Sequence, residues 1–391
     1  MEKLKQKLFV ALEAELSAAS ELRWKVHQDP RISGEESDTL AAFEEHIGFQ
    51  VTPTAETGGF CRLGPDYGPA IAIRGELDAL PIVEETGVAK ASKNGAMHAC
   101  GHDIHLAALA AVVRAARQVE LPVALIPVLQ PREETYPSGA LDIKNSGLLE
   151  KEKVAYAIGA HVHPGIPKGE VALGSGVVNA AAGELHIEIV GSGGHGAYPH
   201  QAQDVVATIA AIATGIHEIV RRNVNPMHPA LVSVGQMIAD SGAPNVLPAT
   251  GKIAATIRTT GSEDASYVVA ALDKYCSSVA TAYGVSANLT YVEGEPVLDN
   301  DPTLCEEMKQ ELKPCGISIG EPMRSLGADD FSFFSSVVPS VMAFVGVENQ
   351  VSAEGVSLHD PRFLPDEDAV RRVALTMMAG YLAGVKLLQI D

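Results

Sequence analysis

The sequence is short of basic residues. It contains 29 lysines and arginines against 49 acidic residues, which leaves a net charge of −20 at pH 7. A surface of that sign repels phosphate backbones and anionic lipid headgroups. We therefore expect neither nucleic acid nor a membrane among the partners of this chain.

The chain also has few cysteines and no long apolar run near its start. Its five cysteines are an odd number without regular spacing, which suits a reducing compartment better than a disulfide framework. The apolar run at residues 8–12 is too short for the core of a signal peptide or for a membrane span. These absences predict a cytoplasmic protein.

What is present is typical of a folded globular protein. Of the 391 residues, 46% are apolar and 20% are charged, and this length predicts two or three domains. Apolar residues at helical spacing predict helices at 3–21, 105–118 and about 365–388. Unbroken apolar runs predict buried parallel strands at 70–77, 122–130, 154–162 and 339–347. Together these elements indicate an α/β domain with a mainly parallel sheet.

The segment 181–293 has a different character. Residues 183–190 alternate between apolar and polar, and helical patterns follow at 204–223 and 262–283. The full order of strand, helix, strand, strand, helix, strand is typical of a ferredoxin-like α+β unit. We therefore predict a small domain at 181–293, inserted into a larger α/β domain formed by residues 1–180 and 294–391.

Reactive side chains follow the ends of the predicted parallel strands, where ligands gather in open sheets. The segment 97–105 (MHACGHDIH) contains three histidines, a cysteine and an aspartate just before a predicted helix. Cys100 and His102 flank a glycine, a spacing that can present two ligands to one metal ion. Cys100 could instead be a nucleophile with His102 or His105 as its base, or its thiol could be packed in the core. The residues alone leave these three interpretations open.

Two adjacent carboxylates, Glu133 and Glu134, follow the predicted strand at 122–130. Neighbouring carboxylates repel each other unless a cation or a proton intervenes, so the pair favours a metal site. One carboxylate can then bind the metal while the other takes a proton from water, whose pKa zinc lowers to roughly 7. His161 and His359 follow two further strands, although either histidine taken alone is an ordinary core or surface residue.

Seven ordered motifs resemble a known family. They are MHACGHDIH (97–105), QPREE (130–134), AHVHP (160–164), GSGGHGAYPH (191–200), NVLP (245–248), GADDFSFF (327–334) and LHDPRF (358–363). In this order they are similar to the two-metal amidohydrolases that include hippurate hydrolase, indole-acetyl-amino-acid amidohydrolases and bacterial aminoacylases. The resemblance covers nearly the whole chain from residue 22 onward. It implies a catalytic α/β domain with an inserted lid and dimerisation domain.

The resemblance also implies the residues of the site. It assigns five ligands to two divalent ions, zinc or manganese: Cys100, His102, Glu134, His161 and His359. Cys100 would bridge the two ions as a thiolate, and Glu133 would be the general base. His195, in the lid, would contact the reacting carbonyl, while Asn245 and Arg258 would hold the carboxylate of the substrate.

The implied reaction is hydrolysis of the amide bond of an N-acyl amino acid, to a carboxylic acid and a free amino acid, by a homodimer formed through the lid. The sequence departs from the family pattern at Glu76, where an aspartate is common, and at Arg132, where a small residue is usual. Neither change removes a ligand or the base, but Arg132 and His163 beside the site predict an altered substrate preference. Three further residues suit either a role in orienting ligands or a role in packing and turns: His98, Asp103 and His105.

Two alternatives from other functional classes stay open. The chain could be a thiol hydrolase that uses Cys100 as its nucleophile. It could also be a binding protein that keeps the fold without catalysis, although binding alone does not need the base Glu133.

Overall fold

The computed structural model describes residues 1–351 and 355–388, so a few positions of the expected segment 294–391 lie outside the described residues. The chain divides into two compact units. Unit 1 comprises Met1–Val178, Asp299–Met323 and Asp330–Asp391, and unit 2 comprises Asn179–Leu298 and Arg324–Asp329. We did not predict that the short segment Arg324–Asp329 groups with unit 2. Hydrogen bonds explain this grouping, because the backbone N–H of Ala180 donates to the carbonyl oxygens of Ser325 and Gly327 at 3.2 and 3.1 Å.

Unit 1 contains most of the helices and the larger sheet. Its helices are α1 (Glu2–Gln28), α2 (Ser37–Ile47), α3 (His102–Ala116), α4 (Gly139–Asn145), α5 (Leu148–Lys151), α8 (Pro302–Leu312), α9 (Ser332–Ser335) and α10 (Ala369–Leu387). Its strands are β1 (Thr52–Thr54), β2 (Gly58–Phe60), β3 (Ala70–Glu76), β4 (Ala124–Gln130), β5 (Val154–His163), β6 (Glu170–Ala172), β15 (Ser318–Gly320) and β16 (Ser340–Gly346). Two short strands, β7 (Gly176–Asn179) and β14 (Leu298–Asn300), pair with each other and contain the residues at which the units divide.

The sheet of unit 1 has the strand order β1-β2-β4-β3-β5-β16-β6-β15. Its four central strands, β4, β3, β5 and β16, run parallel to one another. Every residue of β3, β4 and β16 is buried, as their unbroken apolar runs predict. The mainly parallel α/β sheet expected from the sequence is confirmed. Because β4 lies on one side of β3 and β5 on the other, the strand order reverses at β3, and such a point is where open sheets bind ligands.

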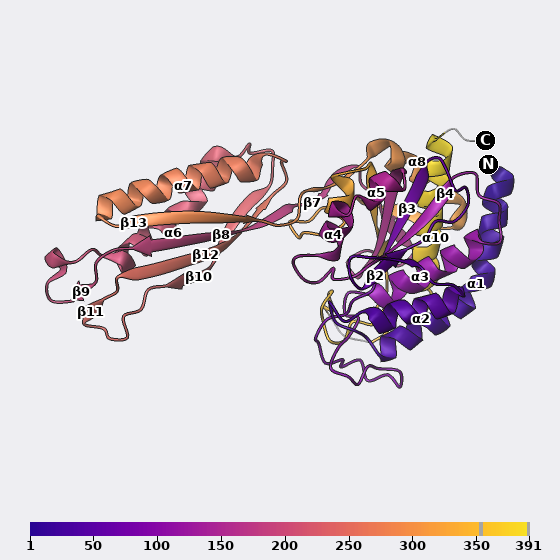
Figure 1. The fold of residues 1–391 in the computed structure, drawn as a ribbon, viewed down its shortest axis with the longest axis horizontal. Helices are drawn as coiled ribbons and strands as arrows, with labels where there is room; N and C mark the ends of the chain where they lie inside the picture. The colour runs from indigo at the N-terminus through magenta and orange to yellow at the C-terminus, as the bar shows by residue number, and fades with distance from the viewer. Residues whose placement is uncertain (352–354, 389–391) are drawn as a thin grey trace. The chain divides into compact units, whose positions relative to one another are not determined.

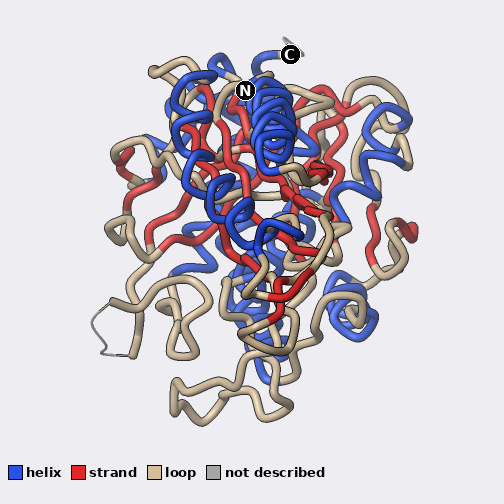
Figure 2. The backbone as a smooth tube through the Cα atoms, turned by 90° about the vertical axis from the view of Figure 1, so that its left-hand side faces the viewer, coloured by secondary structure: helices blue, strands red, loops and turns tan. Residues whose placement is uncertain are grey.

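Helices cover both faces of this sheet, as Figures 1 and 2 show. On one face α3 and α10 pack against the central strands, and α1 and α8 pack on these helices. On the other face α4 and α9 pack together, against β4 and β16 respectively. Almost every residue of α3 is buried, which its alanine, leucine and valine composition permits. The carboxyl ends of the strands and the start of α3 thus rest on a closely packed frame.

Helix α3 begins earlier than the sequence indicated. We expected a helix from residue 105, but its first residue is His102, so that expectation was wrong by three residues. Gly101 precedes the helix with φ of +87°, and a Cβ at this position would lie 2.4 Å from Cγ2 of Val162. Only glycine combines that backbone conformation with so close an approach. The tight turn places His102 at the start of the helix, next to the end of β5.

Unit 2 has the predicted order of elements. They are β8 (Ala181–Val190), α6 (Val205–Asn223), β10 (Ala230–Ile238), β12 (Thr250–Thr259), α7 (Asp264–Tyr283) and β13 (Ser286–Glu293). The strands form an antiparallel sheet in the order β10-β12-β8-β13, and α6 and α7 pack together over one face (Figure 1). This arrangement confirms the ferredoxin-like topology. A small pair of strands that we did not predict, β9 (Gly194–His195) and β11 (Val246–Leu247), adjoins it.

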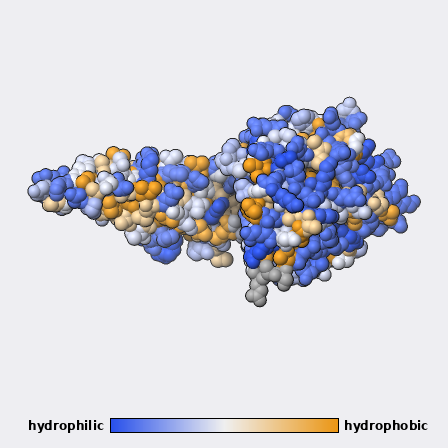
Figure 3. Space-filling model, turned by 90° about the horizontal axis from the view of Figure 1, so that it is seen from below, coloured by the Kyte–Doolittle hydropathy of each residue, from blue (hydrophilic) through white to orange (hydrophobic). Residues whose placement is uncertain are grey.

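The surface of unit 1 is mainly hydrophilic on the face drawn in Figure 3. Its apolar side chains gather inside, in one core that includes residues of α1, α3, α8, α10 and the central strands. None of the described helices is both long enough and apolar enough to cross a membrane.

Candidate metal centre

The five predicted ligands come from four separate segments of unit 1. His161 lies on β5, Glu134 follows β4, and His359 lies between β16 and α10. Cys100 lies in the turn before α3, and His102 is the first residue of that helix. These segments meet at the carboxyl ends of the parallel strands, which is the edge the topology favours.

Cys100 lies in the middle of the ligand group. Its Sγ is 3.3 Å from Nε2 of His161. Donor atoms of Cys100, His102 and Glu134 all lie within 4.8 Å of one another. Nε2 of His359 is in turn 3.3 Å from Oε1 of Glu134. The structure therefore brings all five predicted ligands together.

Hydrogen bonds orient two of the imidazoles. Nδ1 of His161 is 2.7 Å from the carbonyl oxygen of Val162, and Nδ1 of His102 is 2.9 Å from that of Asp78. A carbonyl oxygen only accepts, so each Nδ1 carries the proton and donates it. In the neutral form of each ring, Nε2 then has the lone pair that a metal ion needs, and it faces the ligand group.

Asp78 supports the ligands from behind. One of its carboxylate oxygens accepts hydrogen bonds from the backbone N–H of Glu134 at 3.0 Å and from the Ser33 hydroxyl at 2.7 Å. Burial alone would raise the pKa of Asp78, but the neighbouring His102 and these hydrogen bonds lower it to about 2. Asp78 is therefore a buried anion that holds both a histidine and a glutamate of the site.

Glu133 and Glu134 differ in their surroundings. Glu134 adjoins Cys100, His102 and His359, and its side chain is 10% exposed. Oε2 of Glu133 lies 3.7 Å from Nε2 of His102, and its side chain is 13% exposed. Glu134 thus lies among the predicted ligands, whereas Glu133 lies at the edge of that group.

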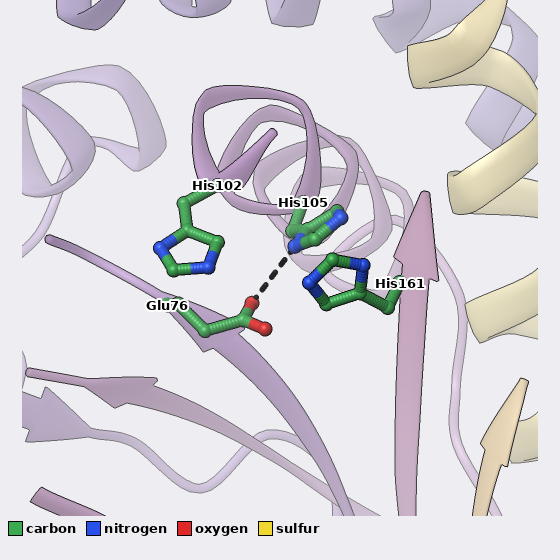
Figure 4. Close-up of side chains that lie close together, drawn as sticks. All are labelled: Glu76, His102, His105 and His161. Atoms are coloured by element: carbon green, nitrogen blue, oxygen red, sulfur yellow. Dashed lines mark hydrogen bonds and ion pairs between the residues drawn. The ribbon is translucent and has the colours of Figure 1, made fainter. Parts of the chain in front are cut away.

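A second layer of buried groups lies behind His161 (Figure 4). The backbone N–H of Val162 donates to Nε2 of His105 at 2.9 Å, so Nδ1 of that ring carries the proton and donates to Glu76 at 3.1 Å. His105 therefore connects the end of β5, through Nε2, to the end of β3, through Nδ1. Arg74 donates to Glu76 and, at 3.2 Å, to Asp330. Sequence reasoning missed Asp330, and its only signal was its place in the motif at 327–334.

His359 needs the surrounding structure to hold its backbone. Its φ of +66° lies in the left-handed region, which residues with a side chain seldom adopt. The backbone N–H of His359 donates to the carbonyl oxygen of Ala99 at 2.9 Å, next to Cys100. One ligand segment is thereby attached directly to another.

The remaining predicted site residues lie in unit 2, where two of them are neighbours. His195 on β9 pairs with Val246 on β11, and the N–H of Gly196 donates to the carbonyl oxygen of Asn245 at 2.7 Å. The N–H of Ala197 donates to Nδ1 of His195 at 3.1 Å, so Nε2 of this exposed ring carries the proton. His195 and Asn245 therefore form an exposed pair in which the imidazole can donate a hydrogen bond.

Arg258 is not part of that pair. It lies on β12 eight residues after Thr250, where the strand leaves the β11 turn. At roughly 3.3 Å per residue, this separation is about 26 Å along the strand. Within one copy of unit 2, Arg258 and Asn245 are too far apart to contact one carboxylate.

A family model described as Peptidase family M20/M25/M40 matches residues 72–379. The chain belongs to this family. The resemblance to two-metal amidohydrolases is thereby confirmed, and the protein is a hydrolase of the M20 family.

Curated relatives of this M20 hydrolase match it over most of both chains. N-acetyl-L-cysteine deacetylase of Bacillus subtilis (strain 168) is 34% identical over 357 residues, which cover 89% of this chain and 84% of that protein. N-acetyldiaminopimelate deacetylase of Shouchella clausii (strain KSM-K16) is 32% identical over 374 residues, which cover 93% and 97%.

Solved structures share the fold. The YXEP protein of Bacillus subtilis, described as a dinuclear metal-binding peptidase of the M20 family, matches with a TM-score of 0.81 and 26% identity. The match covers 97% of this chain and 100% of that one. A protein of methicillin-resistant Staphylococcus aureus matches with a TM-score of 0.89 and 26% identity, over 99% and 100% of the two chains.

The donor set of this M20 hydrolase fits divalent cations. Nε2 of His102 is buried and has no hydrogen-bond partner among the described residues. Buried polar atoms are rarely left without a partner, so this nitrogen, close to the Cys100 thiol and the Glu134 carboxylate, indicates a cation site. One thiol, imidazoles and a carboxylate are ligands that zinc takes, and imidazole with carboxylate also suits manganese.

The two residues expected to alter substrate preference have defined partners. Arg132 has φ of +49° and directs its guanidinium to Glu56, at 2.5 Å, and to Asp142. The N–H of Gly165 donates to Nδ1 of half-buried His163 at 3.1 Å. Arg132 is thus held by carboxylates outside the ligand group.

Proposed function

We propose that this M20 hydrolase cleaves the amide bond of N-acyl amino acids, releasing a carboxylic acid and a free amino acid. The observation that carries the proposal is the ligand group in unit 1, with Glu133 at its edge, 3.7 Å from His102. Two relatives named as deacetylases of N-acetylated amino acids support the substrate class.

The proposal includes two divalent ions in each subunit, zinc or manganese, which Cys100 as a thiolate would hold together with His102, Glu134, His161 and His359. When bound, such ions supply Lewis acidity to a carbonyl oxygen and make water more acidic. The protein's own contribution is to fix the donors, since His102 and His161 are oriented through Nδ1 and Glu134 through its backbone N–H.

Glu133 is the group that moves protons in this proposal. Its partial exposure lets water reach it, while its neighbour Glu134 is occupied among the ligands. As a general base Glu133 takes the proton of the attacking water, and as a general acid it returns that proton to the amine that leaves. Atoms and charge then balance, because water adds across the C–N bond.

Unit 2 supplies the groups that recognise the substrate. Nε2–H of His195 stabilises the negative charge that develops on the carbonyl oxygen. Arg258 and Asn245 bind the α-carboxylate of the amino acid, for which a guanidinium has a matching planar fork. Arg258 lies about 26 Å along β12 from Thr250, the end of the strand that follows the turn of Asn245. The proposal therefore has Arg258 and Asn245 reach one substrate from two different subunits, which requires a homodimer.

The two alternatives, a thiol hydrolase and a binding protein without catalysis, have less support from the structure. Burial raises the pKa of the Cys100 thiol, which is opposite to the change that activates a cysteine nucleophile. A binding protein without catalysis would not need a partly exposed carboxylate at Glu133, beside the ligands.

A substrate screen tests the proposed function. The full chain is stripped with a chelator, reloaded with zinc or manganese, and assayed on a series of N-acyl amino acids for release of the free amine. Activity that requires the metal supports the proposal. Equal activity in excess chelator would favour the thiol alternative, and a loaded protein that hydrolyses none of the series would contradict the substrate class.

A further inference from the structure

Four buried polar side chains form an ionic group outside the ligand group of unit 1. Arg23 and His27 lie one turn apart on α1, Asp103 is the second residue of α3, and Glu84 lies in the loop after β3. All four side chains are at most 2% exposed. Burying several charges is costly unless they are paired, so this group needs a structural or functional reason.

His27 joins two carboxylates. Its Nδ1 lies 2.9 Å from Asp103 and its Nε2 lies 3.3 Å from Glu84. Carboxylates only accept, so both ring nitrogens donate and the ring is an imidazolium. Burial alone would lower the pKa of His27, but its hydrogen bonds to Asp103 and Glu84 raise it to about 9.

Arg23 connects the same group to another segment. Its Nε donates to Asp103 at 3.3 Å, and one terminal nitrogen donates to the carbonyl oxygen of Pro365 at 3.0 Å. A guanidinium with its donors in a fixed fork can hold two such acceptors in one geometry. Arg23 therefore ties the start of α3 to the segment that follows His359.

The segments joined in this way are those that carry ligands. Asp103 directly follows His102, and Pro365 lies six residues after His359. The loop of Glu84 is joined to the same region, since the N–H of Glu85 donates to the carbonyl oxygen of Pro361 at 2.8 Å. Movement of α1 relative to these segments would displace ligands on both sides of the site.

We propose that Arg23 and His27 are positioning residues of the metal centre, which hold the segments of His102 and His359 together through Asp103 and Pro365. The inference rests on the proposed function only in taking these histidines as metal ligands. It adds that affinity for the metal depends on a helix that supplies none of the predicted ligands.

A second ion pair between the same two helices provides a matched control. Near the other end of α3, Nε of Arg114 donates to Glu15 of α1 at 2.5 Å. This pair also holds α1 against α3, but it lies about three turns along the helix from His102. Loss of this pair should weaken the packing of α1 without moving the ligands.

The test compares His27→Gln with Glu15→Gln in the full chain. Zinc alone is titrated into metal-free protein in competition with a chromophoric chelator, and the unfolding free energy of each metal-free protein is measured separately. We expect His27→Gln to weaken zinc binding about 10- to 100-fold, as changes behind metal ligands do. Glu15→Gln should leave zinc affinity within about threefold, whatever it does to stability, because it lies far from the ligands.

A second variant keeps the inference testable if His27→Gln does not fold. Arg23→Lys retains the positive charge but loses the forked set of guanidinium donors. We therefore expect this variant to fold and to lose less zinc affinity than the roughly 10- to 100-fold expected for His27→Gln. Unchanged affinity in the folded variants, or an equal loss in Glu15→Gln, would overturn the inference and leave the proposed function intact. A wild-type chain that binds no zinc or manganese would overturn both.

Discussion

The predicted ligands of unit 1 and the predicted substrate-binding residues of unit 2 are held in different ways. Cys100, His102 and His161 are buried, and hydrogen bonds orient both imidazoles. In unit 2, His195 and Asn245 are exposed and belong to a two-residue strand pair and its turn. Metal ligands must meet a fixed geometry to within tenths of an ångström. A side chain that binds a flexible substrate does not need to be fixed before the substrate arrives.

The two units also differ in how many neighbouring residues form hydrogen bonds that support each site residue. Asp78 supports His102 and Glu134, and the His105–Glu76 pair supports the end of β5 after His161. Substitution of such outer groups typically lowers metal affinity or activity by about 10- to 100-fold. We therefore expect substitutions in unit 1 to separate into effects on metal content and effects on proton transfer, and those in unit 2 to act on substrate recognition.

The largest expected effect is a difference between substitutions of the two adjacent carboxylates of unit 1, Glu133 and Glu134. Glu133→Gln should lower kcat by about 100-fold or more, because general bases contribute on the order of 10² to 10⁴. It should keep its metal, since the proposal does not count it as a ligand. Glu134→Gln should lose metal as well as activity. Metal analysis of the purified proteins, together with kcat, checks both.

The same measurements can contradict the distinct roles proposed for Glu133 and Glu134. If Glu133→Gln and Glu134→Gln lose metal to the same extent, the two carboxylates are not divided between proton transfer and binding. Unit 1 would then contain a ligand that the resemblance did not assign.

A smaller effect is expected in unit 2. Arg258→Ala should lower kcat/KM for N-acyl amino acids about 10- to 150-fold, because a hydrogen bond to a charged group contributes about 1.5–3 kcal/mol. Substrates whose α-carboxylate is replaced by an amide should change little, since they lack the charge that Arg258 recognises. Lys252→Ala is the control, because Lys252 is an exposed cation on the same strand. Equal losses on both substrate series would contradict the assigned role of Arg258.

Much of the fold could be predicted because its signals are local. Buried parallel strands appear as unbroken apolar runs, and β3, β4, β5 and β16 were found within a few residues. Short elements such as β9 and β11 carry too few residues to show a period. The start of α3 was missed because the turn at Gly101 depends on its close approach to Val162, which is distant in the sequence.

The site was predictable in a different way. The thiol, imidazole and carboxylate chemistry indicated a metal, but the set of five ligands came from the resemblance and not from spacing. The groups behind the ligands were largely hidden, since Arg23 and Asp103 are 80 residues apart and Arg74 and Asp330 are 256 apart. No local pattern shows which buried charge will pair with which.

A third, smaller effect concerns pH and should be confined to unit 1. His27 faces Asp103 and Glu84, with Arg23 beside it and His98 nearby, and its pKa is raised from 6.5 to about 9. A raised pKa stabilises the folded state fully below pH 6.5, and this contribution is lost as pH rises through 9. Between pH 7 and 9 the unfolding free energy of the metal-free protein should fall by about 2 kcal/mol more in the wild type than in His27→Gln. Denaturant unfolding at both pH values checks this, and parallel losses in both proteins would contradict it.

The smallest expected effect belongs to Arg132, which the sequence placed beside the site and the structure directs toward Glu56 and Asp142. Its φ of +49° costs about 1 kcal/mol for a residue with a side chain, and glycine would remove that cost. Arg132→Gly also loses two partly exposed ion pairs, which contribute about 0–1 kcal/mol each. The two terms oppose each other, so the unfolding free energy should change by less than about 1 kcal/mol. The ratio of kcat/KM values across the N-acyl series should stay constant, because the guanidinium is already occupied. A changed ratio of kcat/KM values would show that Arg132 does influence substrate specificity. Residues of unit 1, and not only those of unit 2, would then contribute to substrate recognition.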